Sequence, residues 1–133
     1  VFEPCETDEG THRCPHAIRD FPYRHQGDTR ASTTSQFQQY NCSDANEGGP
    51  EVVYVLNIRR AGTLSVSIST DDPNADPDIH LLWGDDHQAC LTRAHETFEH
   101  PVTPGRYLII VDTWVNGSNE ALVGPYRLEV DFL

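Results

Sequence analysis

Clusters of carboxylate and amide side chains are the parts of this sequence best suited to chemistry, because their oxygen atoms can bind a metal ion. Ca²⁺ takes about six to eight oxygen ligands from carboxylates, amides and backbone carbonyls, which one loop or adjoining strand ends must bring together. A first set of oxygen-bearing residues precedes a predicted strand: Asn41, Ser43, Asp44, Asn46, Glu47 and Glu51. Asp112, near the end of another predicted strand, could complete it. The set predicts a structural calcium site, and the alternative is a solvated acidic loop.

A second group of oxygen-bearing side chains falls within residues 71–78 and comprises Asp71, Asp72, Asn74, Asp76 and Asp78. The spacing resembles only the start of an EF-hand loop, because the glycine at the sixth position and the terminal glutamate are absent. A calcium loop of another kind is one interpretation of this group. The other is a turn in which Asp and Asn side chains bond to nearby backbone amides.

The cysteines and the histidines near them offer a different kind of site. His12, Cys14 and His16, with Cys5 upstream, could hold zinc or copper if the thiols were reduced. Four cysteines without a C-x-x-C spacing favour two disulfides instead, and hence an oxidising compartment. We predict the pairs Cys5–Cys14, which closes a small local loop, and Cys42–Cys90, which ties the entry segment to the strands that follow.

Catalytic motifs are missing from the sequence. It has no Gly-x-Ser-x-Gly elbow, no His-Glu-x-x-His helix and no Gly-rich phosphate loop. The sequence neighbours closest to acid–base pairs are His80 with Asp78 and His100 with Glu99. We therefore predict that the chain is not an enzyme, with a small hydrolase as a remaining hypothesis.

Two surface features suggest binding or modification. Trp114 opens a polar loop after an apolar strand, and we predict that it presents an exposed ring to a binding partner. The triplets Asn41-Cys42-Ser43 and Asn116-Gly117-Ser118 fit the N-glycosylation pattern, which makes Asn41 and Asn116 candidate glycan acceptors.

Charge and length narrow the class of protein. The 133 residues carry 21 acidic residues against nine arginines and no lysine, for a net charge of -12. A phosphate backbone or an anionic membrane surface would repel such a chain, and no apolar run approaches the roughly 20 residues that span a bilayer. The chain begins at Val1 without a basic and apolar leader, so we expect a secreted protein whose signal peptide has been removed.

The elements that must position these residues are strands. Apolar and polar residues alternate in run after run beyond residue 50, as the period of a half-buried strand requires. The alternation predicts strands at residues 51–58, 64–69, 79–83, 89–94, 97–102, 106–113 and 126–132. We therefore predict an all-β fold, an antiparallel jelly-roll-like β-sandwich of about seven or eight strands. Residues 31–40 fit either a short helix or an irregular strand, and residues 1–26 are predicted to be a disulfide-stapled N-terminal arm.

The order and spacing of several short motifs resemble those of the bacterial pre-peptidase C-terminal domain family over residues 27–133. They are Gly27-Asp28-Thr29, Tyr40-x-Cys42, Gly49-Pro50-Glu51-Val52-Val53-Tyr54, Ala61-Gly62-Thr63-Leu64, Asp76-x-Asp78-Ile79-His80-Leu81, Cys90-Leu91, Pro104-Gly105-Arg106-Tyr107, Val111-Asp112-Thr113 and Gly124-Pro125-Tyr126. The resemblance implies a jelly-roll sandwich from a secreted bacterial hydrolase, usually non-catalytic and often calcium-binding. In some members it implies binding of a substrate such as collagen or polysaccharide. It also supports Asp44, Glu47, Glu51 and Asp112 as metal ligands.

Two functions from different classes follow. The first is a secreted, calcium-stabilised, non-catalytic module that binds an extracellular polymer or protein and neither nucleic acid nor membrane. The second is a structural subunit of an extracellular filament or surface assembly. In that case the arm of residues 1–26 would dock on the next copy of the chain and add a strand to an open sheet edge.

Overall fold

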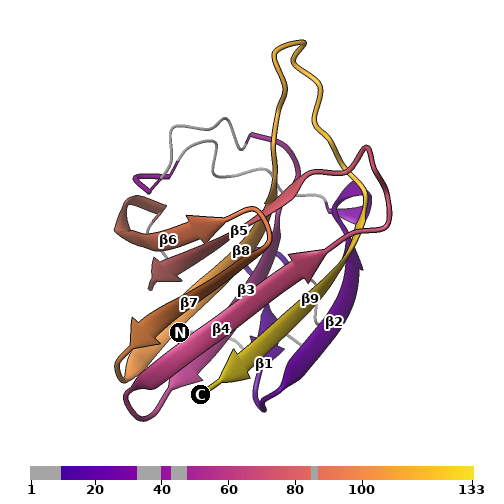
Figure 1. Cartoon of the computed structure of the whole chain (residues 1–133). Coiled ribbons are helices and arrows are strands. Elements are labelled where there is room, and N and C mark those ends of the chain that lie inside the picture. The colour runs from indigo at the N-terminus through magenta and orange to yellow at the C-terminus, as the bar shows by residue number, and fades with distance from the viewer. Residues whose placement is uncertain (1–9, 33–39, 43–47, 85–86) are drawn as a thin grey trace.

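The computed structural model describes residues 10–32, 40–42, 48–84 and 87–133, which form two packed β-sheets (Figure 1). The five-stranded sheet has the order β1-β3-β8-β5-β6, and the four-stranded sheet has the order β2-β9-β4-β7. The strands are β1 (His16–Ile18), β2 (Tyr23–Asp28), β3 (Val52–Ile58), β4 (Gly62–Ser69), β5 (Pro77–Trp83), β6 (Cys90–Ala94), β7 (Thr97–Val102), β8 (Gly105–Thr113) and β9 (Pro125–Phe132). Short 3₁₀ turns occupy Thr29–Ala31 and His87–Ala89. The predicted all-β sandwich is confirmed.

The strands predicted from alternation correspond to β3 through β9, and their ends lie within two residues of the expected ones. In β4 the residues Leu64, Val66 and Ile68 are buried while the serines between them face outward, as the pattern requires. β8 is buried on both faces because it lies near the centre of its sheet and a further segment covers its outer side. No helix in the described part of the chain is long and apolar enough to cross a membrane.

The described part of the predicted arm folds onto the sandwich. β1 pairs in parallel with β3, and β2 pairs with β9 along its whole length, so the predicted boundary at residue 27 falls inside β2. Hydrophobic alternation does not reveal these strands, for β1 has only three residues and β2 turns Tyr23 and His25, rather than aliphatic residues, toward the interior.

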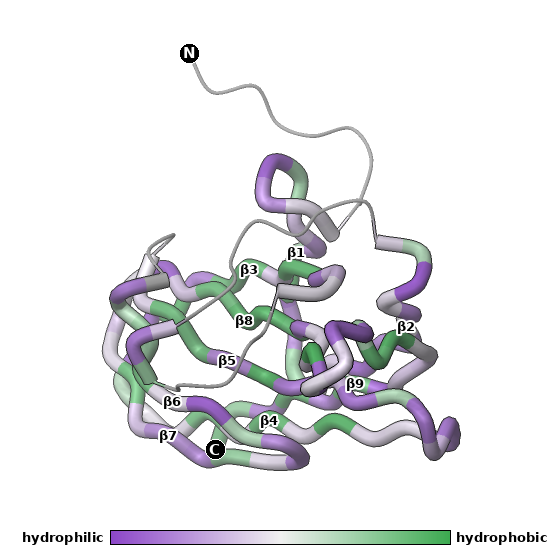
Figure 2. Tube along the Cα trace, turned by 90° about the horizontal axis from the view of Figure 1, so that it is seen from above, coloured by the Kyte–Doolittle hydropathy of each residue, from purple (hydrophilic) through white to green (hydrophobic). Residues whose placement is uncertain are grey.

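The main core lies between the two sheets and contains the inward side chains of both. Tyr54 of β3, Ile109 of β8 and Val130 of β9 are fully buried there. Seen from above, the tube is largely green along β3 and β8, the central strands of the larger sheet (Figure 2). A second cluster covers the outer face of that sheet and consists of Tyr40, Val53, Leu82, Cys90, Leu108 and Ile110.

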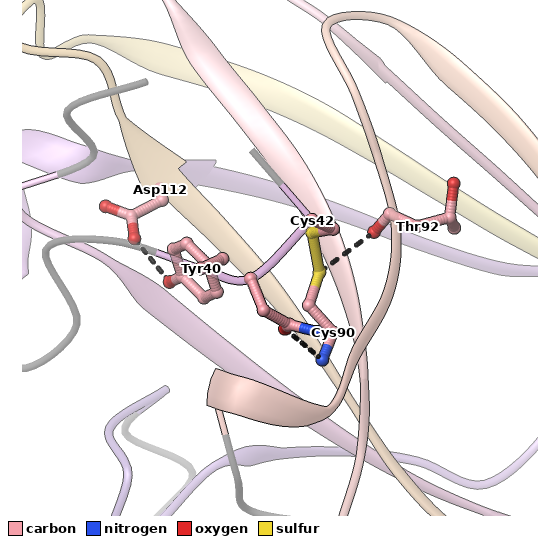
Figure 3. The surroundings of a disulfide bond; sticks show 6 residues. Tyr40, Cys42, Cys90, Thr92 and Asp112 are labelled. Atoms are coloured by element: carbon pink, nitrogen blue, oxygen red, sulfur yellow. Dashed lines mark hydrogen bonds between the residues drawn. A yellow bond between two sulfur atoms is a disulfide. The ribbon is translucent and has the colours of Figure 1, made fainter. Parts of the chain in front are cut away.

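A disulfide holds the segment of residues 40–42, which covers this outer face, in place. Cys42 is bonded to Cys90 at the start of β6, as predicted, and the backbone N–H of Cys90 donates to Oδ1 of Asn41 at 2.8 Å (Figure 3). Cys14 is also disulfide-bonded, and its expected partner Cys5 lies outside the described residues. This disulfide excludes the interpretation in which the Cys14 thiolate binds zinc or copper, because an oxidised sulfur is no longer a thiolate ligand.

Candidate functional site

Three carboxylates lie in a row across the outer face of the five-stranded sheet, at the end where β3 and β5 begin and β8 ends. Asp78 of β5 pairs with Asp112 of β8, and Glu51 immediately precedes the β3 residue that pairs with Val111. The flanking residues of β5 and β8 line the core, so Asp78 and Asp112 face the opposite side of the sheet. All three side chains are fully buried. We call Glu51, Asp112 and Asp78 the carboxylate row.

Tyr40 joins two members of the carboxylate row. Its hydroxyl donates to Oδ2 of Asp112 at 2.5 Å and lies 3.4 Å from Oε2 of Glu51, and Figure 3 shows the ring pointing toward Asp112 beside the disulfide. The second oxygen of Asp112 accepts from the backbone N–H of Thr113 at 2.8 Å. Two carboxylates that approach one hydroxyl in a buried place form a strongly acidic, oxygen-rich site.

The chain around Glu51 is fixed by several short contacts. Nε2 of His12 lies 3.1 Å from Oε1 of Glu51, and the hydroxyl of Ser32 donates to the Glu51 carbonyl. The hydroxyl of Thr113 donates to the Pro50 carbonyl at 2.6 Å, and the N–H of Gly49 donates to the Thr113 carbonyl at 3.3 Å. The entry to β3 is thus bound to the end of β8, which places Glu51 beside Asp112.

The other end of the carboxylate row is an ion-pair cluster. Nη2 of Arg93 donates to Oδ2 of Asp78 at 2.9 Å, and Nδ1 of His95 lies 2.7 Å from Oδ1. Donor atoms of Asp76, Asp78 and His95 all lie within 4.8 Å of one another. Desolvation, and then the charge of Asp78, raise the pKa of Asp76. A donor set with an imidazole nitrogen suits transition metals better than calcium, and Arg93 already compensates the charge of Asp78.

The second predicted group is therefore divided by the fold. Asp76 and Asp78 come together, whereas Asp71 is exposed and bonds through both oxygens to the guanidinium of Arg127 on β9, at 2.9 Å each. These hydrogen bonds lower the pKa of Asp71. Asp72 instead forms a turn, in which Oδ1 accepts from the backbone N–H of Asn74 at 2.9 Å.

The first predicted group is only partly described. The structure brings Glu51 and Asp112 together at Tyr40, while Asp44, Asn46 and Glu47 lie outside the described residues. The residues on either side of that segment, Cys42 and Gly49, are held by the disulfide and by the bond to Thr113.

Neither of the expected acid–base pairs forms an open catalytic arrangement. His80 is fully buried and stacks on Tyr40 with ring centroids 3.9 Å apart, and burial lowers its pKa to about 4. The imidazole is therefore neutral at physiological pH and inaccessible to a substrate. His100 bonds through Nδ1 to the Pro101 carbonyl at 2.7 Å rather than to the side chain of Glu99.

The predicted surface sites have mixed outcomes. Trp114 is half-buried rather than exposed, and the N–H of Leu122 donates to its carbonyl at 3.1 Å across the hairpin between β8 and β9. Trp83, at the end of β5, is the more exposed tryptophan, with 46% of its surface accessible. Oδ1 of Asn41 and of Asn116 accepts backbone hydrogen bonds, so those bonds leave Nδ2, the glycan-accepting atom, unused.

Sequence reasoning missed the residues that complete the row. Tyr40 lies at the end of a segment whose pattern fits either a helix or a strand. Arg93 and His95 reach Asp78 only because of the pairing between β5 and β6, which contains an irregularity at Leu81 and Leu82. The one usable signal was the alternation of β6, which places Arg93 on the same face of the sheet as His80.

Comparison with known proteins supports the fold. No protein-family model matches the sequence, and no curated protein matches it. The structure is similar to the pre-peptidase C-terminal domain of collagenase from Bacillus anthracis, with a TM-score of 0.59, 19% identity, and coverage of 88% of this chain and 96% of that one.

Two lysozyme inhibitors share the architecture. PliG from Aeromonas hydrophila, a periplasmic inhibitor of g-type lysozyme, is similar with a TM-score of 0.58, 13% identity, and coverage of 88% of this chain and 94% of that one. PliG from Salmonella Typhimurium has a TM-score of 0.51, 15% identity, and coverage of 88% and 96%. The chain thus has the fold of a pre-peptidase C-terminal domain, the family that its sequence motifs resemble.

Proposed function

We propose that this chain is a secreted, non-catalytic β-sandwich module, stabilised by calcium, that binds an extracellular polymer or protein. Solved structures of similar fold include the pre-peptidase C-terminal domain of a collagenase and two periplasmic lysozyme inhibitors, none of which is named as a catalytic domain. The disulfide between Cys42 and Cys90 is in keeping with an oxidising compartment outside the cytoplasm.

The observation that carries the calcium proposal is the burial of Glu51 and Asp112 beside one tyrosine hydroxyl. Two carboxylates removed from water repel each other and lose hydration, so a nearby cation greatly lowers the cost of keeping both ionised. Apart from the imidazole of His12, which lies beside Oε1 of Glu51, the possible ligand atoms around this point are carboxylate and hydroxyl oxygens, the chemistry that calcium prefers. Bound calcium would supply positive charge that links the start of β3 to the end of β8.

The remaining ligands that we propose come from the chain between Cys42 and Gly48. Asp44, Asn46 and Glu47 belong to that segment, and on either side of it Cys42 is held by the disulfide and Gly49 by its hydrogen bond to the Thr113 carbonyl. A short connection anchored at both ends suits a rigid site in which ligands from one loop join those from strand ends.

A structural role fits this site better than a catalytic one. Glu51, Asp112 and His80 are fully buried, and Tyr40 packs over the histidine, so no substrate could reach them without displacing the covering segment. General acid–base catalysis requires the group to come within hydrogen-bond distance of the substrate proton. We therefore assign the row to stability.

The filament alternative loses support from the part of the arm that is described. β1 pairs with β3 of its own chain, and β2 pairs with β9, so both strands contribute one of their two edges to the sandwich itself. We therefore propose an extracellular polymer or a different protein as the partner.

Calcium titration of the chelated full-length chain tests the proposal. An ion at 100 times its Kd adds about 2.7 kcal/mol to the free energy of unfolding. For a domain of this size, that corresponds to a rise of roughly 10 °C in melting temperature. Asp112→Asn should abolish both the binding heat and the temperature shift, whereas Glu129→Gln, an exposed control on β9, should retain both. If the wild-type protein gave neither binding heat nor a shift in melting temperature, the calcium part of the proposal would be wrong.

A further inference from the structure

A cleft of about 810 Å³ opens at one end of the sandwich, on the side where β1 and β2 form the sheet edges. At the opposite edges of the two sheets, β6 and β7 are joined by a short turn, which closes that side of the sandwich (Figure 1). His16 of β1 lines the cleft from one sheet, and Gln26 of β2, Ser69 of β4 and Tyr126 of β9 line it from the other. Its volume lies within the roughly 300–1,000 Å³ typical of ligand sites.

We propose that this cleft binds a neutral oligosaccharide. The inference rests on the proposed binding function and specifies the ligand class and its site. It does not depend on the calcium site. The wall, the charges and the shape of the cleft each support it.

The rings of His16 and His25 line the cleft, and the buried tyrosines Tyr54 and Tyr126 pack behind them. Nδ1 of His25 bonds to the Tyr54 hydroxyl at 2.8 Å, and that hydroxyl bonds to the Tyr126 hydroxyl at 2.6 Å. The rings of His16 and His25 lie 4.6 Å apart, centroid to centroid. A side chain at Gly27 would place its Cβ 2.4 Å from the Tyr126 hydroxyl, so glycine is required there. Rings fixed before binding reduce the conformational entropy that the protein loses when a ligand binds.

The charged groups in the cleft are already paired with opposite charges. Arg127 forms two hydrogen bonds with Asp71, and Asp28 accepts from Nε and Nη2 of Arg30 at 2.6 to 3.1 Å. The whole chain has a net charge of -12, which repels an anionic polymer. A neutral ligand with many hydroxyls can donate to the paired carboxylates and accept from the paired guanidinium without disrupting either pair.

Small polar side chains complete the lining. Gln26, Ser69 and Thr70 offer amide and hydroxyl groups beside the rings. A saccharide presents hydroxyls at its edge and C–H groups on its faces, which matches a wall that combines these two kinds of surface.

The shape favours more than one sugar ring. A second depression of about 310 Å³ shares His25, Gln26, Ser69 and Arg127 with the cleft and continues over the outer face of the four-stranded sheet. The two together form a groove rather than a closed cavity, as binding of a chain requires.

The test measures binding of neutral and acidic tetrasaccharides to the full chain in calcium buffer, by calorimetry and by backbone amide NMR. The neutral probes are cellotetraose, maltotetraose and N-acetylchitotetraose, and the acidic probe is tetragalacturonate. Ser69→Phe should fill the groove, and Ser65→Phe is its matched control on the same face of β4, outside the lining. Gelatin is included as a protein polymer.

We expect at least one neutral tetrasaccharide to shift the amide resonances of Gln26 and Gly27. We expect its Kd to rise about tenfold or more in Ser69→Phe and to stay within about twofold of the wild-type value in Ser65→Phe. No binding by any neutral probe, stronger binding of tetragalacturonate, or an unchanged Kd in Ser69→Phe would each overturn the proposal. If gelatin binds and the saccharides do not, the saccharide assignment fails while the proposed binding function stands.

Discussion

The carboxylate row and the cleft show two ways in which one acidic sandwich handles its charged side chains. In the row, Glu51, Asp112 and Asp78 are fully buried, and Tyr40 closes over part of the site. In the cleft, Asp71 and Arg127 are exposed and neutralise each other across the wall. Buried carboxylates need cationic or hydrogen-bonding partners for the fold to be stable, as Arg93 provides for Asp78, whereas exposed pairs leave part of their hydrogen-bonding capacity for a ligand. The difference matches our two proposals, stability for the row and ligand binding for the cleft.

The largest difference in stability between the two regions should come from the disulfide on the same face of the five-stranded sheet as the row. Replacing Cys42 and Cys90 together by alanine should lower the free energy of unfolding by about 4 kcal/mol in urea, because the bond closes a long loop. The matched control is Ser67→Ala with Thr97→Ala, a hydroxyl pair 3.1 Å apart on the four-stranded sheet. That double variant should change stability by under about 0.5 kcal/mol. Equal losses in the two double variants would contradict the distinction.

The buried histidine beneath Tyr40 should make stability depend on pH. The pKa of His80 is about 4 in the folded chain, below its ordinary value of 6.5, so the unfolded chain binds more protons between these values. His80 therefore contributes about 3 kcal/mol above pH 6.5 that is lost as the pH falls toward 4.

Urea unfolding across this pH range checks the contribution of His80. His80→Phe, which keeps the aromatic stack, should lose less stability than the wild type on acidification, and His100→Gln on β7 should behave as the wild type does. If the unfolding free energy of His80→Phe and of the wild type fell equally with pH, His80 would not contribute to the pH dependence of stability.

Two tyrosine variants compare the regions directly. Tyr40→Phe removes a hydrogen bond to a buried carboxylate and should cost about 2 kcal/mol of unfolding free energy. Tyr126→Phe removes a bond between two neutral hydroxyls and should cost about 1 kcal/mol. Urea unfolding of both variants measures the two losses of unfolding free energy. A larger loss in Tyr126→Phe than in Tyr40→Phe would contradict the expected order.

The smallest effect is expected at the exposed pair in the cleft. Asp71→Asn weakens the contact with Arg127, but both side chains are largely solvated, so the melting temperature should stay within experimental error. Oligosaccharide binding should weaken in the same variant, because the guanidinium loses the partner that orients it. A clear drop in melting temperature would mean that this pair is structural after all.

Much of the fold could be predicted because its central strands alternate cleanly. The inward face of β4 is marked by Leu64, Val66 and Ile68. The apolar run of β8 identifies a central strand. β1 and β2 could not be found this way, since the side chains that β2 turns inward are Tyr23 and His25. Their places depend on pairing with β3 and β9, which local pattern does not specify.

Sequence alone could predict only the part of the candidate site that lies at the ends of predicted strands. Glu51 and Asp112 were expected together because both flank strands, and the pairing of β3 with β8 brings them together. Asp71 was grouped with Asp76 by proximity in sequence, but the end of β4 lies beside β9, so Asp71 meets Arg127 instead. Tyr40 and His95 join the row through long-range register, which no short motif encodes.

Terbium luminescence tests the central claim, calcium at the row, most directly. Tb³⁺ replaces Ca²⁺ at oxygen sites and emits when a neighbouring aromatic ring transfers excitation energy to it, and Tyr40 bonds to Asp112 within the row. We predict sensitised emission that calcium displaces, that Tyr40→Phe strongly reduces, and that Asp112→Asn abolishes. Emission that persists undiminished in both variants, or no emission from the wild type, would contradict a calcium site at Glu51 and Asp112.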